Sequence, residues 1–268
     1  MDNQIKLYYE EHGNKYGDPI IFLNGWGTDH SGLEKHSLIY YKRHYRCIFI
    51  DALGCGRSGS YDEKNSKYIC EQNADEIIKL IKVLNINNVI IYGNCLGGWI
   101  GSLCIMKAPI YFKSLVFIDG FLYFDKEYFL FILPLIRYPL YQFFFQSKLG
   151  LNLSNSFVKF SKKVTHDQII EQKQIDSSVA LAYILDLYKM ERAGYRMKIS
   201  TITIPSLFIC GESTMSVIQK SQSYWKYNVI SSTIESVSDS SHLTVSENPE
   251  ELNTKILSFL NNIISNKK

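Results

Sequence analysis

Five short apolar runs recur along this 268-residue chain, and segments of helix length separate most of them. The runs are rich in Ile, Val, Leu and Phe and are bounded by Gly, Asn or Asp, as buried strands are. They cover residues 19–23, 46–51, 88–92, 114–119 and 205–210. Patterns of helix length cover residues 33–41, 68–84 and 99–108. Strands that alternate with helices predict an α/β fold with a mostly parallel central sheet and helices on both faces.

The ends and the middle of the chain complete this outline. Residues 5–11 alternate apolar and polar side chains, which predicts an antiparallel edge strand. Asn248 and Pro249 are typical of a helix start, so we expect a C-terminal helix. About 80 residues separate the fourth run from the fifth, far more than a simple crossover needs. We therefore expect residues 1–120 and 201–268 to form one α/β core and residues 121–200 to form a helical lid (cap) insertion.

Composition and cysteine spacing indicate the cellular compartment and the class of partner that we expect for such a core. The N-terminal residues lack a basic stretch followed by an apolar one, and no run of about 18 apolar residues exists, so we expect neither a signal peptide nor a membrane span. The six cysteines form no C-x-x-C pair and have no histidines at zinc-ligand spacing. We expect a cytoplasmic protein with reduced thiols, no metal and no cofactor. The net charge of +3 is too small to indicate nucleic-acid binding.

Residues that could carry chemistry follow the expected strands, where ligands bind in an open parallel sheet. Gly93-Asn94-Cys95-Leu96-Gly97 follows the third run, and its glycines suit a tight turn from strand into helix. Asp51 opens an Asp-x-x-Gly-x-Gly-x-Ser motif, and His242 opens a His-x-x-x-x-Glu-x-Pro motif before the last helix. This ordered set resembles the α/β-hydrolase fold superfamily over nearly the whole chain. It is the variant with a cysteine where a serine is usual, as in thioesterase-like and acyltransferase-like enzymes.

The resemblance implies a role for each matching residue. Cys95 would be the nucleophile, because a buried structural thiol needs neither flanking glycines nor a helix that starts beside it. A helix N-terminus would also stabilise its thiolate. His242 would be the general base, and the backbone N–H groups of Trp26 and Leu96 would form the oxyanion hole.

The acid that orients the histidine departs from the family pattern. Thr214 stands where the family usually has an aspartate, three residues after the glycine that ends the fifth strand. Asp119 is the expected substitute, because some family members carry their acid at the end of the preceding strand. It could equally be a turn residue after a strand, and Glu212 and Asp239 are weaker candidates. A thiol needs the acid less than a hydroxyl does, because it ionises more easily.

The expected lid is unusually aromatic at its start. Residues 121–145 contain eleven Phe or Tyr residues, and two prolines break them into short pieces. The surplus favours an apolar pocket for an acyl chain over a single packed helix face, with lid contact to a membrane as a less favoured alternative. The residues expected to touch substrate are Asn24, His30, Phe121, Phe124 and Phe129.

Positive charge is concentrated in the lid. Residues 121–200 hold eleven Lys or Arg and seven Asp or Glu, an excess of four positive charges. Beside an apolar pocket, a basic rim favours an acidic donor, either an acyl carrier protein or a coenzyme A thioester. The stretch Asn24-Gly25-Trp26-Gly27 also resembles the His-Gly-Trp-Gly of carboxylesterases that cleave pimeloyl-carrier-protein methyl ester.

These features together predict an acyl-transfer enzyme, a thioesterase or an acyltransferase, that works through a Cys95 acyl-enzyme. A thioester intermediate keeps the energy of a thioester donor and can pass its acyl group to water, an amine or an alcohol. Two alternatives stay open. One is a carboxylesterase whose nucleophilic serine has been replaced by cysteine through engineering. The other is a non-catalytic hydrolase-fold protein that binds a hydrophobic ligand, which the missing acid at Thr214 would suit.

Overall fold

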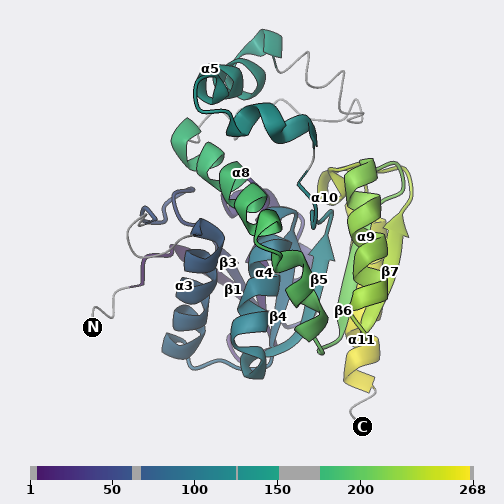
Figure 1. The fold of residues 1–268 in the computed structure, drawn as a ribbon. Helices are drawn as coiled ribbons and strands as arrows, with labels where there is room; N and C mark the ends of the chain where they lie inside the picture. The colour runs from purple at the N-terminus through teal and green to yellow at the C-terminus, as the bar shows by residue number, and fades with distance from the viewer. Residues whose placement is uncertain (1–4, 62–67, 125, 151–175, 266–268) are drawn as a thin grey trace.

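The computed structural model describes residues 5–61, 68–124, 126–150 and 176–265. Within these residues, seven strands form one sheet in the order β1-β3-β2-β4-β5-β6-β7 (Figure 1). β1 pairs antiparallel with β3, and the other pairs are parallel. The strands are β1 (Tyr9–Gly13), β2 (Pro19–Leu23), β3 (Arg46–Ile50), β4 (Val89–Asn94), β5 (Phe112–Ile118), β6 (Ser206–Gly211) and β7 (Ser232–Val237).

Side chains of the central strands alternate between two apolar layers, because successive residues of a strand point to opposite faces. On β2, Ile21 and Leu23 belong to the layer that packs on α3 (Ile69–Val83) and α4 (Leu96–Lys107). Ile20 and Phe22 belong to the opposite layer. Because both faces are covered, a buried strand has to be apolar throughout, as the expected runs are.

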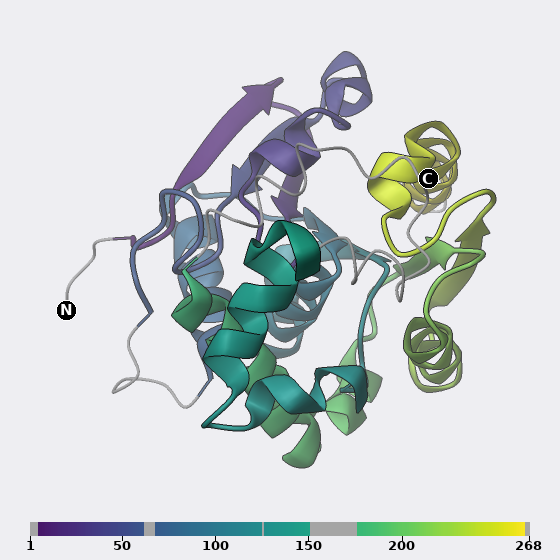
Figure 2. The same cartoon turned by 90° about the horizontal axis from the view of Figure 1, so that it is seen from above.

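Helices cover both faces of the sheet (Figures 1 and 2). One face carries α3, α4 and α9 (Ser216–Asn228), and the other carries α11 (Pro249–Ser265) with α1 (Ser31–Glu34) and α2 (Leu38–Lys42). The short elements η1 (Pro109–Tyr111) and α10 (Thr244–Glu247) complete the core. This arrangement confirms the predicted fold class.

Two elements differ from the sequence-based expectation. Residues 33–41 form two short helices, α1 and α2, because the Ser37 hydroxyl donates to the Leu33 carbonyl at 2.7 Å and competes for the helical hydrogen bonds there. β7 was not expected at all. It is an edge strand whose residues, apart from Val237, are partly or fully exposed, so it lacks an apolar run.

Residues 126–146 lie above the carboxyl ends of the strands, whereas residues 177–201 run from there down past α4 toward the start of β6 (Figure 1). Phe131 and Tyr141 pack with Leu181 and Ile184 in a separate apolar cluster, into which the ring of Trp26 also fits. The elements of this lid are η2 (Lys126–Ile132), α5 (Arg137–Tyr141), η3 (Gln142–Gln146), α8 (Ser177–Arg192) and η4 (Tyr195–Thr201). A search of the described residues found no helix long and apolar enough to cross a bilayer.

The second half of the lid is fixed to the core by buried hydrogen bonds from α8. The Tyr183 hydroxyl donates to the Leu53 carbonyl at 2.8 Å. The carboxylate of Asp186 accepts the N–H of Cys70 in the first turn of α3 at 2.9 Å. These hydrogen bonds therefore hold α8 against the core.

Candidate active site

Cys95 lies at the sharp turn from β4 into α4. Its φ of 50° and ψ of −112° form a conformation that non-glycine residues rarely adopt, and it is held by a 2.7 Å hydrogen bond from its N–H to the Ile118 carbonyl at the end of β5. α4 begins at the next residue, so the side chain stands at the helix N-terminus above the sheet. This is the geometry that the Gly-x-Cys-x-Gly motif predicts.

The glycines around Cys95 permit strand and helix to approach closely. A methyl group on Gly93 would lie 2.3 Å from Cα of Gly98, and one on Gly97 would lie 2.1 Å from the Leu23 carbonyl oxygen. Backbone atoms cannot yield to such contacts without moving the turn. The glycines therefore set the position of Cys95.

We expect Gly93→Ala to destabilise the fold by about 3 kcal/mol or more, because the added methyl would overlap the backbone of α4. Gly59→Ala is the matched control, since its methyl would meet its nearest atom, the Lys6 carbonyl oxygen, at an ordinary 3.4 Å. Its stability should change by less than about 0.5 kcal/mol. Urea unfolding of both variants measures the difference. Equal unfolding midpoints would contradict the close strand–helix approach.

Two backbone N–H groups point at the Cys95 sulfur, those of Trp26 and Leu96. They are the two donors expected for an oxyanion hole. Burial nevertheless raises the pKa of the Cys95 thiol to about 12, and the two N–H groups only partly offset this. The structure thus differs from the expected helix-stabilised thiolate, because desolvation outweighs the helix N-terminus. The resting thiol is protonated at neutral pH.

The loop that carries Trp26 is tied to the lid as well as to the sheet. The Trp26 indole N–H donates to the Ala180 carbonyl of α8 at 3.0 Å, and its ring lies edge-on against Tyr141 and Phe145 at 5.8 and 5.1 Å between centroids. Asn24 shapes the same loop by accepting the Gly25 N–H at 2.8 Å. The Asn24 amide was expected to touch substrate, but in the structure it makes hydrogen bonds to the backbone of its own loop.

His242 lies in the loop between β7 and α10, and Phe121 packs edge-on against its ring at 5.2 Å between centroids. Its Nδ1 is buried and has no hydrogen-bond partner among the described residues. Burial lowers the pKa of the imidazole to about 4, so at neutral pH the ring is uncharged and can accept a proton. Glu247 holds the loop by accepting the Ser241 hydroxyl at 2.9 Å.

Asp119 lies next to this loop but does not bond to His242. Its two carboxylate oxygens accept the N–H groups of Gly211 and Thr244, each at 3.2 Å, and burial raises its pKa to about 8. The predicted hydrogen bond between Asp119 and His242 is therefore not present in the structure. The Asp119 carboxylate instead accepts the backbone N–H of Thr244, two residues after His242. Thr214, at the usual position of the acid, has a buried hydroxyl without a partner among the residues described.

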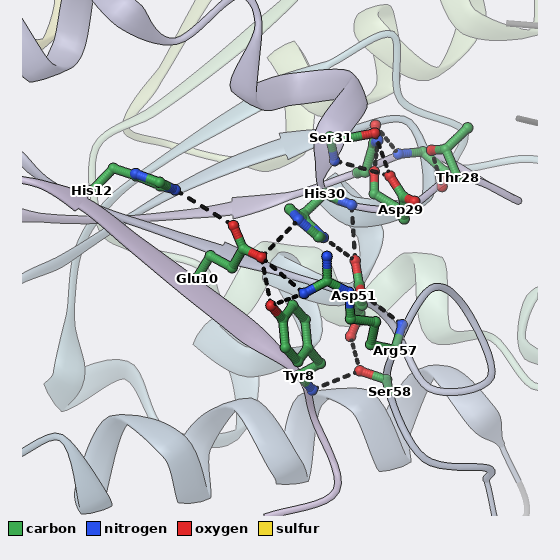
Figure 3. Close-up of polar contacts among 12 residues, drawn as sticks. Tyr8, Glu10, His12, Thr28, Asp29, His30, Ser31, Asp51, Arg57 and Ser58 are labelled. Carbon is green, nitrogen blue, oxygen red and sulfur yellow. Dashed lines mark hydrogen bonds and ion pairs between the residues drawn. The ribbon is translucent and has the colours of Figure 1, made fainter. Parts of the chain in front are cut away.

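His30, which was expected to touch substrate, has its ring between Asp51 and Glu10 (Figure 3). Its Nδ1 lies 2.8 Å from the buried carboxylate of Asp51, and its Nε2 lies 3.5 Å from Glu10. Asp51 also accepts the N–H of Arg57 at 2.8 Å. The Asp-x-x-Gly-x-Gly-x-Ser motif therefore closes a turn, because the side chain of its aspartate bonds the neighbouring backbone.

The two other predicted aromatic contacts lie in the lid. Phe124 packs edge-on against Tyr188 at 5.3 Å between centroids and belongs to the lid cluster. Phe129 is 48% exposed and lies 6.5 Å from the same tyrosine ring. Of the predicted aromatic residues, Phe121 is the one that touches a candidate catalytic side chain.

Sequence reasoning overlooked the residues that hold the His242 loop. Glu247 was noticed only as part of a motif, and Thr244 was not noticed. The spacing of five residues between His242 and Glu247 was the available signal, because a carboxylate one helical turn downstream can reach back to cap a loop.

A model of the alpha/beta hydrolase fold family matches residues 18–163, more than half of the chain. The AB hydrolase superfamily protein YisY of Bacillus subtilis (strain 168) is 33% identical over 97 residues, 36% of this chain and 34% of that protein. Proline iminopeptidase of Xylella fastidiosa (strain 9a5c) is 30% identical over 108 residues, 40% and 33% of the two chains. The matches thus span about a third of each relative.

A solved structure from a study of carboxylesterases of Nitrososphaera gargenis is similar over 99% of this chain and 97% of its own, with a TM-score of 0.77. The two sequences are 17% identical, so the likeness concerns the fold. It extends over the lid region as well as the core.

Proposed function

Since this chain belongs to the alpha/beta hydrolase fold family, we propose that it is an acyl-transfer enzyme, a thioesterase or an acyltransferase, with Cys95 as nucleophile. The observation that carries the proposal is the turn at Cys95, where a strained backbone presents the sulfur to two N–H groups. That arrangement suits the attack on a carbonyl carbon, because the same donors can then bind the oxygen on which negative charge develops.

In the resting protein the Cys95 thiol and the His242 imidazole are both neutral, so catalysis begins with a proton transfer from the thiol to the imidazole. His242 takes the thiol proton as the sulfur attacks the carbonyl carbon, and the N–H groups of Trp26 and Leu96 bind the resulting oxyanion. Collapse expels the leaving thiolate or alkoxide, which receives that proton from the imidazolium. The product is an acyl-enzyme with a thioester bond to Cys95. Water, an amine or an alcohol then attacks this bond while His242 again acts as base.

Asp119 is assigned a positioning role in this scheme. It holds Thr244 and Gly211, and through them the loop that carries His242. No carboxylate among the described residues bonds His242 Nδ1, so the imidazolium gains little electrostatic help. A thiol nucleophile suits this deficit, since it needs a weaker base than a hydroxyl does.

An acyl chain is the favoured substrate group. Phe121 lies against His242, and Trp26, whose N–H is directed at Cys95, packs with the aromatic cluster around Phe131. Aromatic side chains around the proposed nucleophile and base favour a hydrophobic acyl group over a polar one.

The donor is proposed to be an acyl carrier protein or a coenzyme A thioester. Lys189, Arg192 and Lys198 are exposed near the end of α8, and Lys220 on α9 shares the Tyr123 ring with Arg196, at 4.1 and 4.0 Å from its centroid. Such a surface attracts an acidic carrier or a phosphate group. The basic residues Lys159, Lys162 and Lys163 lie outside the described residues.

Intact-protein mass spectrometry with acyl thioesters tests the function. We expect a transient acyl mass on the chain, formed faster from medium- or long-chain thioesters than from acetyl thioesters. With a carrier-protein thioester, the double variant Lys189→Glu and Arg192→Glu should slow adduct formation by about tenfold, and with a small thioester it should not. The control Lys15→Glu, on an exposed residue before β2, should leave both rates unchanged.

The alternatives give different results in the same experiment. An engineered carboxylesterase would form a stable adduct from esters, and Cys95→Ser would raise its ester hydrolysis. A non-catalytic binding protein, which the unpartnered His242 Nδ1 and Thr214 hydroxyl would suit, would bind the acyl chain without any covalent adduct.

A further inference from the structure

Two histidines and two glutamates converge outside the candidate active site, between the edge strand β1 and helix α1. Glu10 and His12 lie on the same side of β1, and His30 and Glu34 come from the segment that forms α1 (Figure 3 shows the first three). Donor atoms of Glu10, His30 and Glu34 all lie within 4.8 Å of one another. His12 Nε2 lies 3.4 Å from a Glu34 oxygen and 3.6 Å from a Glu10 oxygen.

Ring nitrogens of both histidines face these carboxylates. His12 Nε2 is buried and unpartnered among the described residues. His30, with only 8% of its side chain exposed, has its Nε2 3.5 Å from Glu10, while its Nδ1 bonds Asp51 at 2.8 Å. If Nδ1 donates to Asp51, a neutral ring presents the lone pair of Nε2 to a carboxylate, which is unfavourable unless a cation or a proton lies between them.

From this convergence we propose that Glu10, His12, His30 and Glu34 bind a divalent transition-metal ion of the zinc class. Tetrahedral ligands at about 2.1 Å from zinc lie roughly 3.4 Å apart, close to the three nitrogen–oxygen separations in the cluster. The Asp51 carboxylate behind His30 is the partner that metal-ligating histidines usually have. Two imidazoles in the donor set favour zinc over magnesium or calcium, which prefer oxygen ligands.

The charges nearby are consistent with a dication. The carboxylates of Glu10, Glu34 and Asp51 outnumber the guanidinium of Arg57, which contacts Glu10, by two charges. Arg57 donates to Glu10 at 3.2 Å, but its side chain is 64% exposed and can turn toward solvent. The rival arrangement is two protonated histidines, which balance the same charges without a metal.

The metal would fasten β1 to the segment that leads from the Trp26 loop into α1. That segment is continuous with the loop whose N–H group points at Cys95. The site is therefore assigned a structural role, and it does not depend on the proposed acyl transfer.

Titration calorimetry with zinc chloride on the full-length Cys95→Ala chain tests this site without interference from the active-site thiol; the other five cysteines are buried. We expect one equivalent to bind with a Kd of about 1 μM or tighter, and magnesium chloride not to bind. His12→Ala and Glu34→Gln, both at partly exposed residues, should each weaken binding by at least about tenfold. The controls His44→Asn and Glu212→Gln, which lie outside the cluster, should not.

A cobalt(II) titration of the same protein identifies the ligands. We expect a spectrum of nitrogen and oxygen ligands without a sulfur charge-transfer band, and a higher melting temperature in the presence of the metal. The proposal is wrong if zinc does not bind up to about 1 mM, if His12→Ala and Glu34→Gln bind it as tightly as their parent, or if cobalt reports thiolate ligation.

Discussion

Replacement of Cys95 by alanine should abolish the acyl adduct and lower steady-state turnover of an acyl thioester by about 10⁴- to 10⁶-fold, as removal of a nucleophile from a catalytic unit does. The residual rate would come from the Trp26 and Leu96 N–H groups, which can still bind an oxyanion when water attacks. Stopped-flow turnover and intact mass on the same samples measure both effects. The fold should be unchanged, because the strained backbone of residue 95 is held by glycine contacts and by the Ile118 carbonyl.

Cys55→Ala is the matched control for this variant. Burial raises the pKa of Cys55 to about 12, as it does for Cys95, but the thiol lies in the turn after β3 and no N–H pair is directed at it. Its removal should leave adduct formation and turnover within about twofold. If Cys95→Ala kept its turnover while Cys55→Ala lost it, the nucleophile would be misassigned. An unchanged acyl mass in both variants would mean that the acyl group is carried elsewhere.

The sharp turn that carries Cys95 could be predicted because it follows from local backbone sterics. Glycine at 93 lets β4 approach α4, and glycine at 97 lets α4 approach the end of β2, so the spacing of glycines around Cys95 specifies the turn. The buried strands could be predicted for a related reason, because a strand covered on both faces has to be apolar at every position. β7, exposed at the edge of the sheet, offers no such signal.

Contacts between distant segments could not be predicted in this way. The carboxylate of Asp119 lies near enough to the His242 loop to have suggested a catalytic pairing, yet a shift of two residues makes Thr244 its partner. His30 follows the oxyanion loop in sequence, but its ring bonds the buried carboxylate of Asp51. Spacing along the chain does not specify which way a side chain turns between two possible partners. The ionisation state of Cys95 likewise depends on how deeply the lid and loops bury it.

The pH dependence of acylation should distinguish a neutral Cys95–His242 pair from a thiolate–imidazolium pair. Because the pKa of His242 is lowered to about 4 and that of Cys95 is raised to about 12, both groups are neutral between these values. Acylation requires a neutral imidazole, so its rate should rise as pH increases through about 4 and then stay level to about pH 10. A thiolate–imidazolium pair would instead lose activity in alkaline solution as the imidazolium loses its proton. Single-turnover acylation over this pH range measures the profile.

His242→Ala should lower the acylation rate by about 10⁴-fold or more, since it removes the proposed base for the thiol proton. The same substitution should have little effect on alkylation of Cys95 by iodoacetamide, because a neutral histidine does not stabilise the thiolate in the resting protein. In both proteins alkylation should accelerate about tenfold per pH unit from pH 7 to 10, as expected for a thiol that titrates near 12. His44→Asn, which keeps a residue that tolerates the φ of 63° there, is the control and should resemble the parent in both assays. A plateau in alkylation below pH 8 that disappears in His242→Ala would show a preformed ion pair, and would replace general-base catalysis by His242 with a mechanism of the thiolate–imidazolium type.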